Sequence, residues 1–299
     1  MTDRTNATTL PPTAGPPTAG PPTASRAGLL RPEQLARHVD LGRWAPGPAA
    51  SRFVENYWAL AWDLPGDHSF LSETLPHPTC SLTVERATHP RPGVGEDPVV
   101  VTGVVTRRFT VETRGRARVF GVKFRPGGLV ALAGGRARDW TDRVVAARAV
   151  VPLGLRDSLA SLDLDAGFDE AVPVVDDAVA ALRPRRDDET YHRVLAVIAD
   201  MLGDRALLTV AQVEERHDVS ARTLQRWFTT RVGVGPKWVL ARYRMHDAVT
   251  DLDAGYDGSL TELAHRYGWF DQAHFTRDFV DLVGVTPGTY RSRPSRGTS

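Results

Sequence analysis

Apolar side chains recur with two different periods along the chain, and the period changes once. From residue 28 to about 124, short apolar runs lie between segments rich in proline and glycine. Cys80, Leu82 and Val84 alternate with polar residues, which is typical of a strand with one buried face. Helical patterns then continue to about residue 182. Strands followed by helices predict an α+β N-terminal domain, a small β-barrel plus helices. We expect strands over residues 53–64, 80–85, 99–105, 108–113 and 117–124.

Beyond residue 188 the pattern becomes entirely helical. Thr209 is followed three residues later by Gln212, and Ser259 by Glu262; both pairs predict capping boxes at helix starts. Pro236 suits the first position of a long linking helix over residues 237–252. Further helices are expected over residues 189–202 and directly behind Thr209, Ser220, Ser259 and Asp271. The C-terminal part is therefore predicted to be an all-α domain.

These helices form two copies of one motif. Five positions recur 51 residues later: Leu224, Arg226, Phe228, Gly233 and Pro236 correspond to Phe275, Arg277, Phe279, Gly284 and Pro287. Each copy is a short helix, a tight turn and a longer helix, which is the helix-turn-helix plan. The linking helix would hold the copies apart, so that their second helices meet successive major grooves, roughly 34 Å apart.

The formal net charge is only +1, but the charge is unevenly distributed. Residues 220–245 contain six basic side chains and no acidic one. A local basic face attracts a phosphate backbone, although such a face is also compatible with plain solvation. The charge pattern alone does not separate these two interpretations.

The ends and the middle of the chain predict its division into domains. The Pro-Pro-Thr-Ala-Gly repeats of residues 1–27 predict a disordered tail. A polar, proline-containing segment near residue 183 predicts a boundary between an α+β domain over 28–183 and the helical domain over 188–292, followed by a tail over 293–299. No apolar run is long enough to span a membrane and no secretory signal is visible, so we expect a cytoplasmic protein.

With the repeat established, residues 190–292 resemble the DNA-binding domain of the AraC/XylS family of transcription regulators. The resemblance rests on Ser220-Ala-Arg-Thr-Leu-Gln-Arg-Trp-Phe228, on Ala264-His-Arg-Tyr-Gly-Trp-Phe-Asp-Gln-Ala-His-Phe-Thr-Arg-Asp-Phe279 and on Gly284-Val-Thr-Pro-Gly-Thr-Tyr-Arg291. It implies a non-enzymatic, sequence-specific regulator with double-stranded DNA as partner, compatible with RNA polymerase contact and with a homodimer, and without a cofactor. The first copy departs from the pattern: Glu214 and Asp218 stand where alanine and glycine are usual. We expect Asp218 to adopt a left-handed turn conformation.

The exposed sides of the two second helices supply the candidate DNA-binding residues. The resemblance implies base contacts by Arg222, Gln225 and Arg226, since arginine and glutamine can bind guanine and adenine edges with two hydrogen bonds. Thr229 lies on the same side. The second copy offers Gln272, His274, Thr276 and Arg277, and Arg291 could reach a phosphate. Arg242 or Arg244 is expected to brace the domain through a buried ion pair with Asp271 or Glu262.

The N-terminal part resembles, over Gly121-Val-Lys-Phe-Arg-Pro-Gly-Gly128, a segment of barrel-like sensor domains. This resemblance implies a small-molecule effector or a dimerisation role. His68, Glu73, His77, Cys80 and His89 lack the spacing of a metal site, and no catalytic motif is present. Tyr57, Trp58 and Trp62 are expected in the core rather than around a ligand. Two alternatives stay open: a regulator with no effector, and a ligand-binding barrel whose helices contact a protein.

Overall fold

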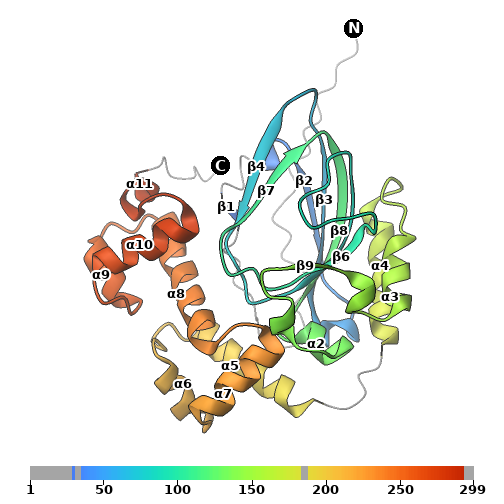
Figure 1. Ribbon diagram of the computed structural model, residues 1–299. Helices are drawn as coiled ribbons and strands as arrows, with labels where there is room; N and C mark the ends of the chain where they lie inside the picture. Colours follow the sequence, from blue (N-terminus) through green and yellow to red (C-terminus); the bar gives the residue numbers. More distant parts are fainter. Residues whose placement is uncertain (1–28, 31–34, 183–187, 293–299) are drawn as a thin grey trace.

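The computed structural model describes residues 29–30, 35–182 and 188–292. The predicted tails over 1–27 and 293–299 and the boundary next to residue 183 lie outside these residues. The described part contains a β-rich N-terminal region and an entirely helical C-terminal region, as the sequence predicts (Figure 1).

The N-terminal strands form two antiparallel sheets rather than one closed barrel. The larger sheet has the order β2-β3-β8-β5-β6-β9, and the smaller has the order β1-β4-β7. Their bounds are β1 Leu29–Leu30, β2 Asp40–Trp44, β3 Val54–Asp63, β4 Ser69–Thr74, β5 Ser81–Ala87, β6 Val99–Thr102, β7 Phe109–Arg114, β8 Arg116–Phe124 and β9 Val144–Ala146. All five predicted strands are confirmed, whereas β1, β2, β4 and β9 had no expected counterpart.

One shared corner joins the two sheets. Strand β3 leads into β4, and β7 leads into β8 through the single residue Gly115, whose φ is 53°. The pairing continues across the bend, because Asp63 pairs with Arg116 and Ser69 pairs with Arg114. The smaller sheet therefore folds over one face of the larger one, and an interior space remains between them.

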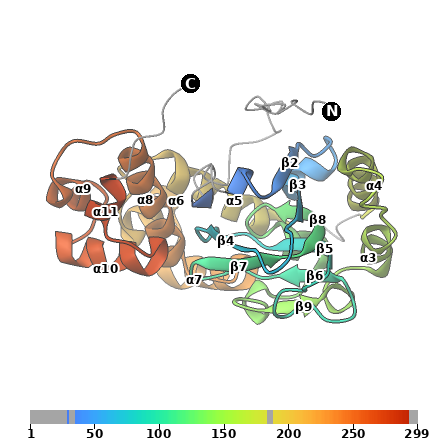
Figure 2. The same ribbon diagram turned by 90° about the horizontal axis from the view of Figure 1, so that it is seen from above.

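The opposite face of the larger sheet carries the hydrophobic core. Helices α3 (Leu153–Ala160) and α4 (Phe168–Ala181) cover this face (Figure 2). Leu82, Val84 and Phe120 are fully buried there, so the alternation along β5 reports its buried face correctly. Tyr57 lies in the same core, and its hydroxyl donates to Asp176 of α4 at 2.8 Å.

The C-terminal region consists of seven α-helices within residues 188–292. They are α5 Glu189–Gly203, α6 Val210–His217, α7 Ala221–Trp227, α8 Pro236–Asp253, α9 Leu260–Arg266, α10 Gln272–Val283 and α11 Pro287–Arg291. Helix α7 continues as a π-helix over Phe228–Val232. Both predicted capping boxes are present, at Thr209 and at Ser259. The Asp271 side chain caps α10 by accepting from the backbone N–H of His274 at 2.7 Å.

The two regions pack against each other through several contacts. The Tyr191 hydroxyl of α5 donates to the backbone carbonyl of Arg52 at 2.7 Å, and its ring stacks on Phe53. The Thr141 hydroxyl donates to the carbonyl of Gly233 at 2.8 Å. Leu75, which follows β4, is buried in the hydrophobic cluster of the second helix-turn-helix unit. The helical region is therefore docked on the sheets along both of its units.

Candidate nucleic-acid interface

The two helix-turn-helix units turn in the same way. Asp218 after α6 and Gly268 after α9 both have left-handed backbone, with φ of 45° and 84°. The following residues, Val219 and Trp269, are buried and donate their backbone N–H groups back to Glu214 and Ala264. The expectation for Asp218 is confirmed: the short polar side chain accepts the conformation that glycine adopts in the second unit.

The second helix of the first unit, α7 with its continuation to Val232, separates its buried and exposed sides as predicted. Leu224 and Phe228 are fully buried, whereas Arg222, Gln225 and Arg226 are exposed. Arg222 and Arg226 lie one turn apart, and no ion pair within the described residues involves either guanidinium. Both side chains therefore keep their full set of N–H donors for an outside partner.

Two polar side chains of this segment lie close to other parts of the protein, and one of them, Thr229, is hydrogen-bonded. The Gln225 side-chain amide lies against Gly235, at the start of α8. The Thr229 hydroxyl donates to the carbonyl of Gln225 at 2.6 Å, so its proton is used within its own helix. Thr229 can therefore act toward DNA only as an acceptor or through its methyl group.

The second helix of the second unit, α10, presents a more mixed surface. Phe275 and Phe279 are buried, and Arg277 is exposed without an ion pair among the described residues. The Gln272 side-chain carbonyl accepts from Thr261 of α9 at 2.9 Å, which leaves its NH₂ group available. Nε2 of His274 lies 3.4 Å from a carboxylate oxygen of Asp278. These residues share one helix, together with the half-buried Thr276.

Arg291 has an internal partner as well as solvent exposure. Its Nη1 donates to the carbonyl of Gly258, in the segment before α9, at 2.8 Å. Because a guanidinium carries five N–H donors, this bond leaves others available to a phosphate.

The linking helix α8 contains the buried ion pair that the sequence predicts, but with another partner. Arg244 is 2% exposed and lies 2.9 Å from Asp247 on the next turn; it also donates to the carbonyl of Met201 on α5. The predicted partners, Asp271 and Glu262, are wrong. Both carboxylates are used as helix caps, which holds them at the starts of α10 and α9.

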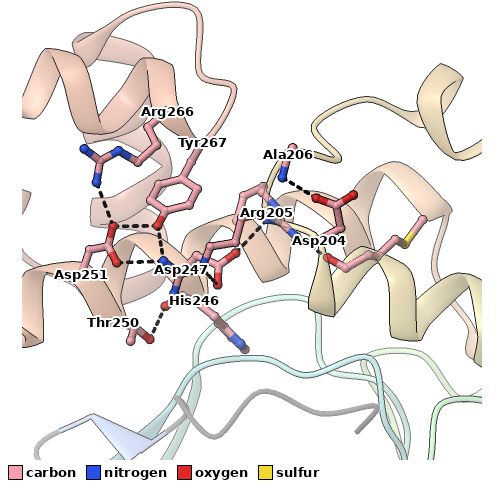
Figure 3. A network of polar contacts seen from close by, with 11 residues as sticks. Asp204, Arg205, Ala206, His246, Asp247, Thr250, Asp251, Arg266 and Tyr267 are labelled. Carbon is pink, nitrogen blue, oxygen red and sulfur yellow. Dashed lines mark hydrogen bonds and ion pairs between the residues drawn. The ribbon is translucent and has the colours of Figure 1, made fainter. Parts of the chain in front are cut away.

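A polar network ties the linking helix to both units (Figure 3). Asp251 of α8 accepts from the Tyr267 hydroxyl at 2.7 Å and pairs with Arg205 and Arg266 at 3.1 and 3.3 Å. Arg205 lies between α5 and α6, and it also approaches Asp247 at 3.4 Å. One carboxylate thus joins a residue that precedes α6 with residues at the end of α9. The network therefore connects the two units through α8.

Sequence reasoning missed this network, although one signal was present. Asp247 and Asp251 are four residues apart on a predicted helix, so they occupy one face. Their partners come from other helices and have no local signature. Arg242, the other arginine of the predicted brace, instead stacks on Trp238 with 4.6 Å to the ring centre and donates to the carbonyl of Thr106 at 3.4 Å.

The space between the sheets is a cavity of about 280 Å³. Trp58 and Trp62 line it, so the expectation that they belong to the core is wrong for these two and right for Tyr57.

Cys80 is buried, and burial raises the pKa of its thiol to about 12, which disfavours the reactive thiolate. Among the described residues, no group of His, Cys, Asp and Glu could hold a metal ion.

Comparison with known proteins agrees with the geometry of the helical region. Residues 214–293 match a family model described as a helix-turn-helix domain, and residues 42–146 match a domain of unknown function, DUF6597. An AraC-like transcription regulator of Streptomyces lividans is 33% identical over 87 residues, covering 29% of this chain and 28% of that protein. A regulatory protein of the thc operon of Rhodococcus erythropolis is 37% identical over 83 residues, covering 27% and 25%. The chain thus spans about a quarter of the length of these curated relatives.

Solved structures give matches with low TM-scores. The C-terminal domain of AraT, a response regulator from Geobacillus stearothermophilus, has 25% identity and a TM-score of 0.30, covering 38% of this chain and 92% of that one. ToxT from Vibrio cholerae has 9% identity and a TM-score of 0.35, covering 85% of this chain and 98% of that one.

None of the described helices is long and apolar enough to cross a membrane.

The repeat, the matched turns and the family match concern the same residues. The curated relatives that align with this region are AraC-like or operon regulators. The C-terminal region of this chain therefore contains a helix-turn-helix domain, and it is similar in sequence to AraC-like regulators over that region.

Proposed function

We propose that this protein is a sequence-specific DNA-binding transcription regulator. The observation that carries the proposal is the pair of helix-turn-helix units, which together present three exposed arginines that lack ion pairs within the described residues. Arg222 and Arg226 belong to the first unit and Arg277 to the second. A DNA duplex supplies what such arginines lack, namely phosphate oxygens and the acceptor edge of guanine.

The exposed side chains divide into two roles in this proposal. Arg222, Gln225 and Arg226 read base edges in one major groove, while Thr229 contacts the duplex as an acceptor or through its methyl group. Gln272, Thr276 and Arg277 act in the next groove. His274 and Arg291 contact phosphates, which position the protein without reading sequence.

The N-terminal region would make the regulator responsive to a small molecule. The supporting observation is the segment over residues 75–77, which lines the cavity and also touches the helical region. Leu75 is buried in the cluster of the second unit, and the His77 ring meets the ring of His246 on α8 at 4.7 Å. A molecule in the cavity would press on this segment and so alter the docking of the linking helix. Homodimerisation and contact with RNA polymerase belong to the same proposal.

The test is fluorescence anisotropy of the full chain on its own upstream DNA and on a scrambled duplex, at one salt concentration near physiological strength. We expect the upstream DNA to be preferred by about a thousandfold or more. Arg116→Ala serves as a control variant, because it removes an exposed arginine of the N-terminal region. It should leave the preference for upstream over scrambled DNA unchanged. Absence of binding to either duplex even at low salt would contradict the proposal.

A further inference from the structure

The cavity between the sheets is lined by a mixture of side chains that a plain core would not contain. The inward face of the larger sheet carries Arg43 on β2, Asn56 on β3, Ser81 and Thr83 on β5, and Lys123 on β8. On the other face of β8, Val122 and Phe124 are fully buried. Because polar groups are costly between packed sheets unless they have partners, the inward positions indicate a site for a polar ligand.

Lys123 is the most informative of these residues. It lines the cavity from β8, and no ion pair or hydrogen bond within the described residues involves its ammonium group. The carboxylate that influences it, Glu55, lies 3.9 Å from Arg125 instead. The pKa of Lys123 is lowered to about 8, mainly by burial; the negative charge of Glu55 partly opposes this shift and the positive charge of Arg43 adds to it. A nearby anion would relieve this unfavourable burial.

The acidic residue of the lining does not neutralise these cations. Glu85 is bound by Arg91 through two contacts of 2.7 and 2.9 Å and accepts from the Thr83 hydroxyl at 2.6 Å. Arg43 lies at an exposed position of the lining and completes the positive end. The lining therefore carries net positive charge next to Lys123.

The rest of the lining includes a group of aromatic and aliphatic side chains beside further polar ones such as Thr74, Thr102 and Thr113. Trp58, Trp62 and Phe109 line the cavity with Leu41, Leu60, Val111 and Val119. The Trp58 indole lies against Gly121 on β8, where a Cβ atom would overlap the ring. Gly121 is two residues before Lys123 and on the same face of the strand, so an aromatic platform lies beside the ammonium group.

We propose that this cavity binds a small aromatic carboxylate, with the carboxylate at Lys123 and Arg43 and the ring against Trp58. This inference rests on the cavity being the effector site of the proposed function. A carboxylate fits better than a phosphate ester because the site offers two single positive charges, Lys123 and Arg43, beside the Trp58 ring. The volume of about 280 Å³ lies at the lower end of ligand pockets and selects for a small molecule.

The proposal is tested by calorimetry on the full chain, without DNA. The probes are phenylacetate, 3-phenylpropanoate, 4-phenylbutyrate and indole-3-acetate, each compared with its neutral primary amide. We expect at least one acid to bind at least tenfold more tightly than its amide, and Lys123→Met to abolish that difference. Lys237→Met is the matched control, because Lys237 is the other lysine of the chain and lies exposed on α8.

Affinity should also depend on pH in a defined direction. The charged or titratable groups around Lys123 are Arg43 on β2, Glu55 on β3, His246 on α8, the Glu85–Arg91 pair, and His77, which lines the cavity beside His246. Burial, followed by the positive charges of Arg242 and Lys123, lowers the pKa of His246 to about 3, so this ring stays neutral at pH 7. Bound acid stabilises the protonated form of Lys123 and should therefore raise its pKa. The affinity for the acid should be constant below about pH 8, where Lys123 is protonated in the free protein. Above about pH 8 the affinity should fall, because the free protein loses this proton. We expect about tenfold weaker binding at pH 9 than at pH 7.

A second measurement keeps the test valid if Lys123→Met does not fold. Reductive ¹³C-methylation labels both lysines of the wild-type chain, and Lys237→Met assigns their NMR signals. The Lys123 signal should titrate near pH 8 and move to higher pH when the acid binds. Equal binding of acid and amide, no binding of any acid, or an unchanged Lys123 titration would each overturn the proposal. Specific DNA binding in such a case would leave the proposed regulator function intact.

Discussion

At the scale of single residues, the candidate interface depends on which exposed side chains lack internal partners. Arg222, Arg226 and Arg277 have no ion pair among the described residues, whereas Thr229 and Gln272 are hydrogen-bonded to neighbours. Exposure could be predicted from the helical period, because the buried positions Leu224 and Phe228 define the opposite side. The internal hydrogen bonds could not be predicted, since they depend on rotamers and on contacts between helices.

Arg226→Ala should weaken binding to the specific site by about 1–3 kcal/mol and relax preference at one base pair, because the bidentate contact is lost. Anisotropy titrations against a set of single base-pair variants measure both effects. Equal weakening on specific and random DNA would assign Arg226 to a phosphate instead.

His274→Ala should act differently, because the proposed contact is with a phosphate. We expect binding to specific and random DNA to weaken together, with a smaller effect at high salt. Titrations at several salt concentrations measure this. An effect confined to specific DNA would show that His274 reads a base.

At the scale of elements, local signals predicted far more than distant ones. The capping boxes at Thr209 and Ser259 and the turn at Asp218 depend on residues three or four apart, so the sequence contains the whole interaction. Strand β4 was missed because Phe70 and Leu71 are its only apolar residues, which is too short an apolar run to predict a strand, and its register is fixed only by pairing with its neighbours. Trp58 was assigned to the wrong place for a related reason. The period of a strand separates its two faces but does not tell which face meets a cavity.

The network around Asp251 is the element whose removal should be most visible. Asp251→Asn should lower the free energy of unfolding by about 1.5–3 kcal/mol, because three charged or polar donors lose an ionised acceptor. Denaturant titration measures the change. Asp257→Asn, at an exposed position outside the network, is the control. The variant should also lose more affinity for the natural site than for random DNA, and an equal loss on both would contradict a role in placing the two units.

At the scale of the whole molecule, the helical region is docked on the sheets, and the cavity wall is part of that contact. Leu75 belongs at once to the cavity lining and to the core of the second unit.

Leu75→Ala should therefore loosen the contact between the regions and lower the free energy of unfolding by about 2–5 kcal/mol, as is typical of a buried leucine. Limited proteolysis between the two regions should accelerate, with Leu71→Ala, which is half exposed on β4, as the control. Equal proteolysis of both variants would show that Leu75 does not hold the regions together.

The central claim is that two helix-turn-helix units, held by one linking helix, read successive major grooves of one DNA site. The most direct measurement is hydroxyl-radical footprinting of the full chain on a duplex selected for tight binding. The account predicts two protected patches on the same face of the duplex, separated by about one helical turn or roughly 34 Å. Arg226→Ala and Arg277→Ala should each weaken one patch. A single patch, or two patches on opposite faces, would contradict the account.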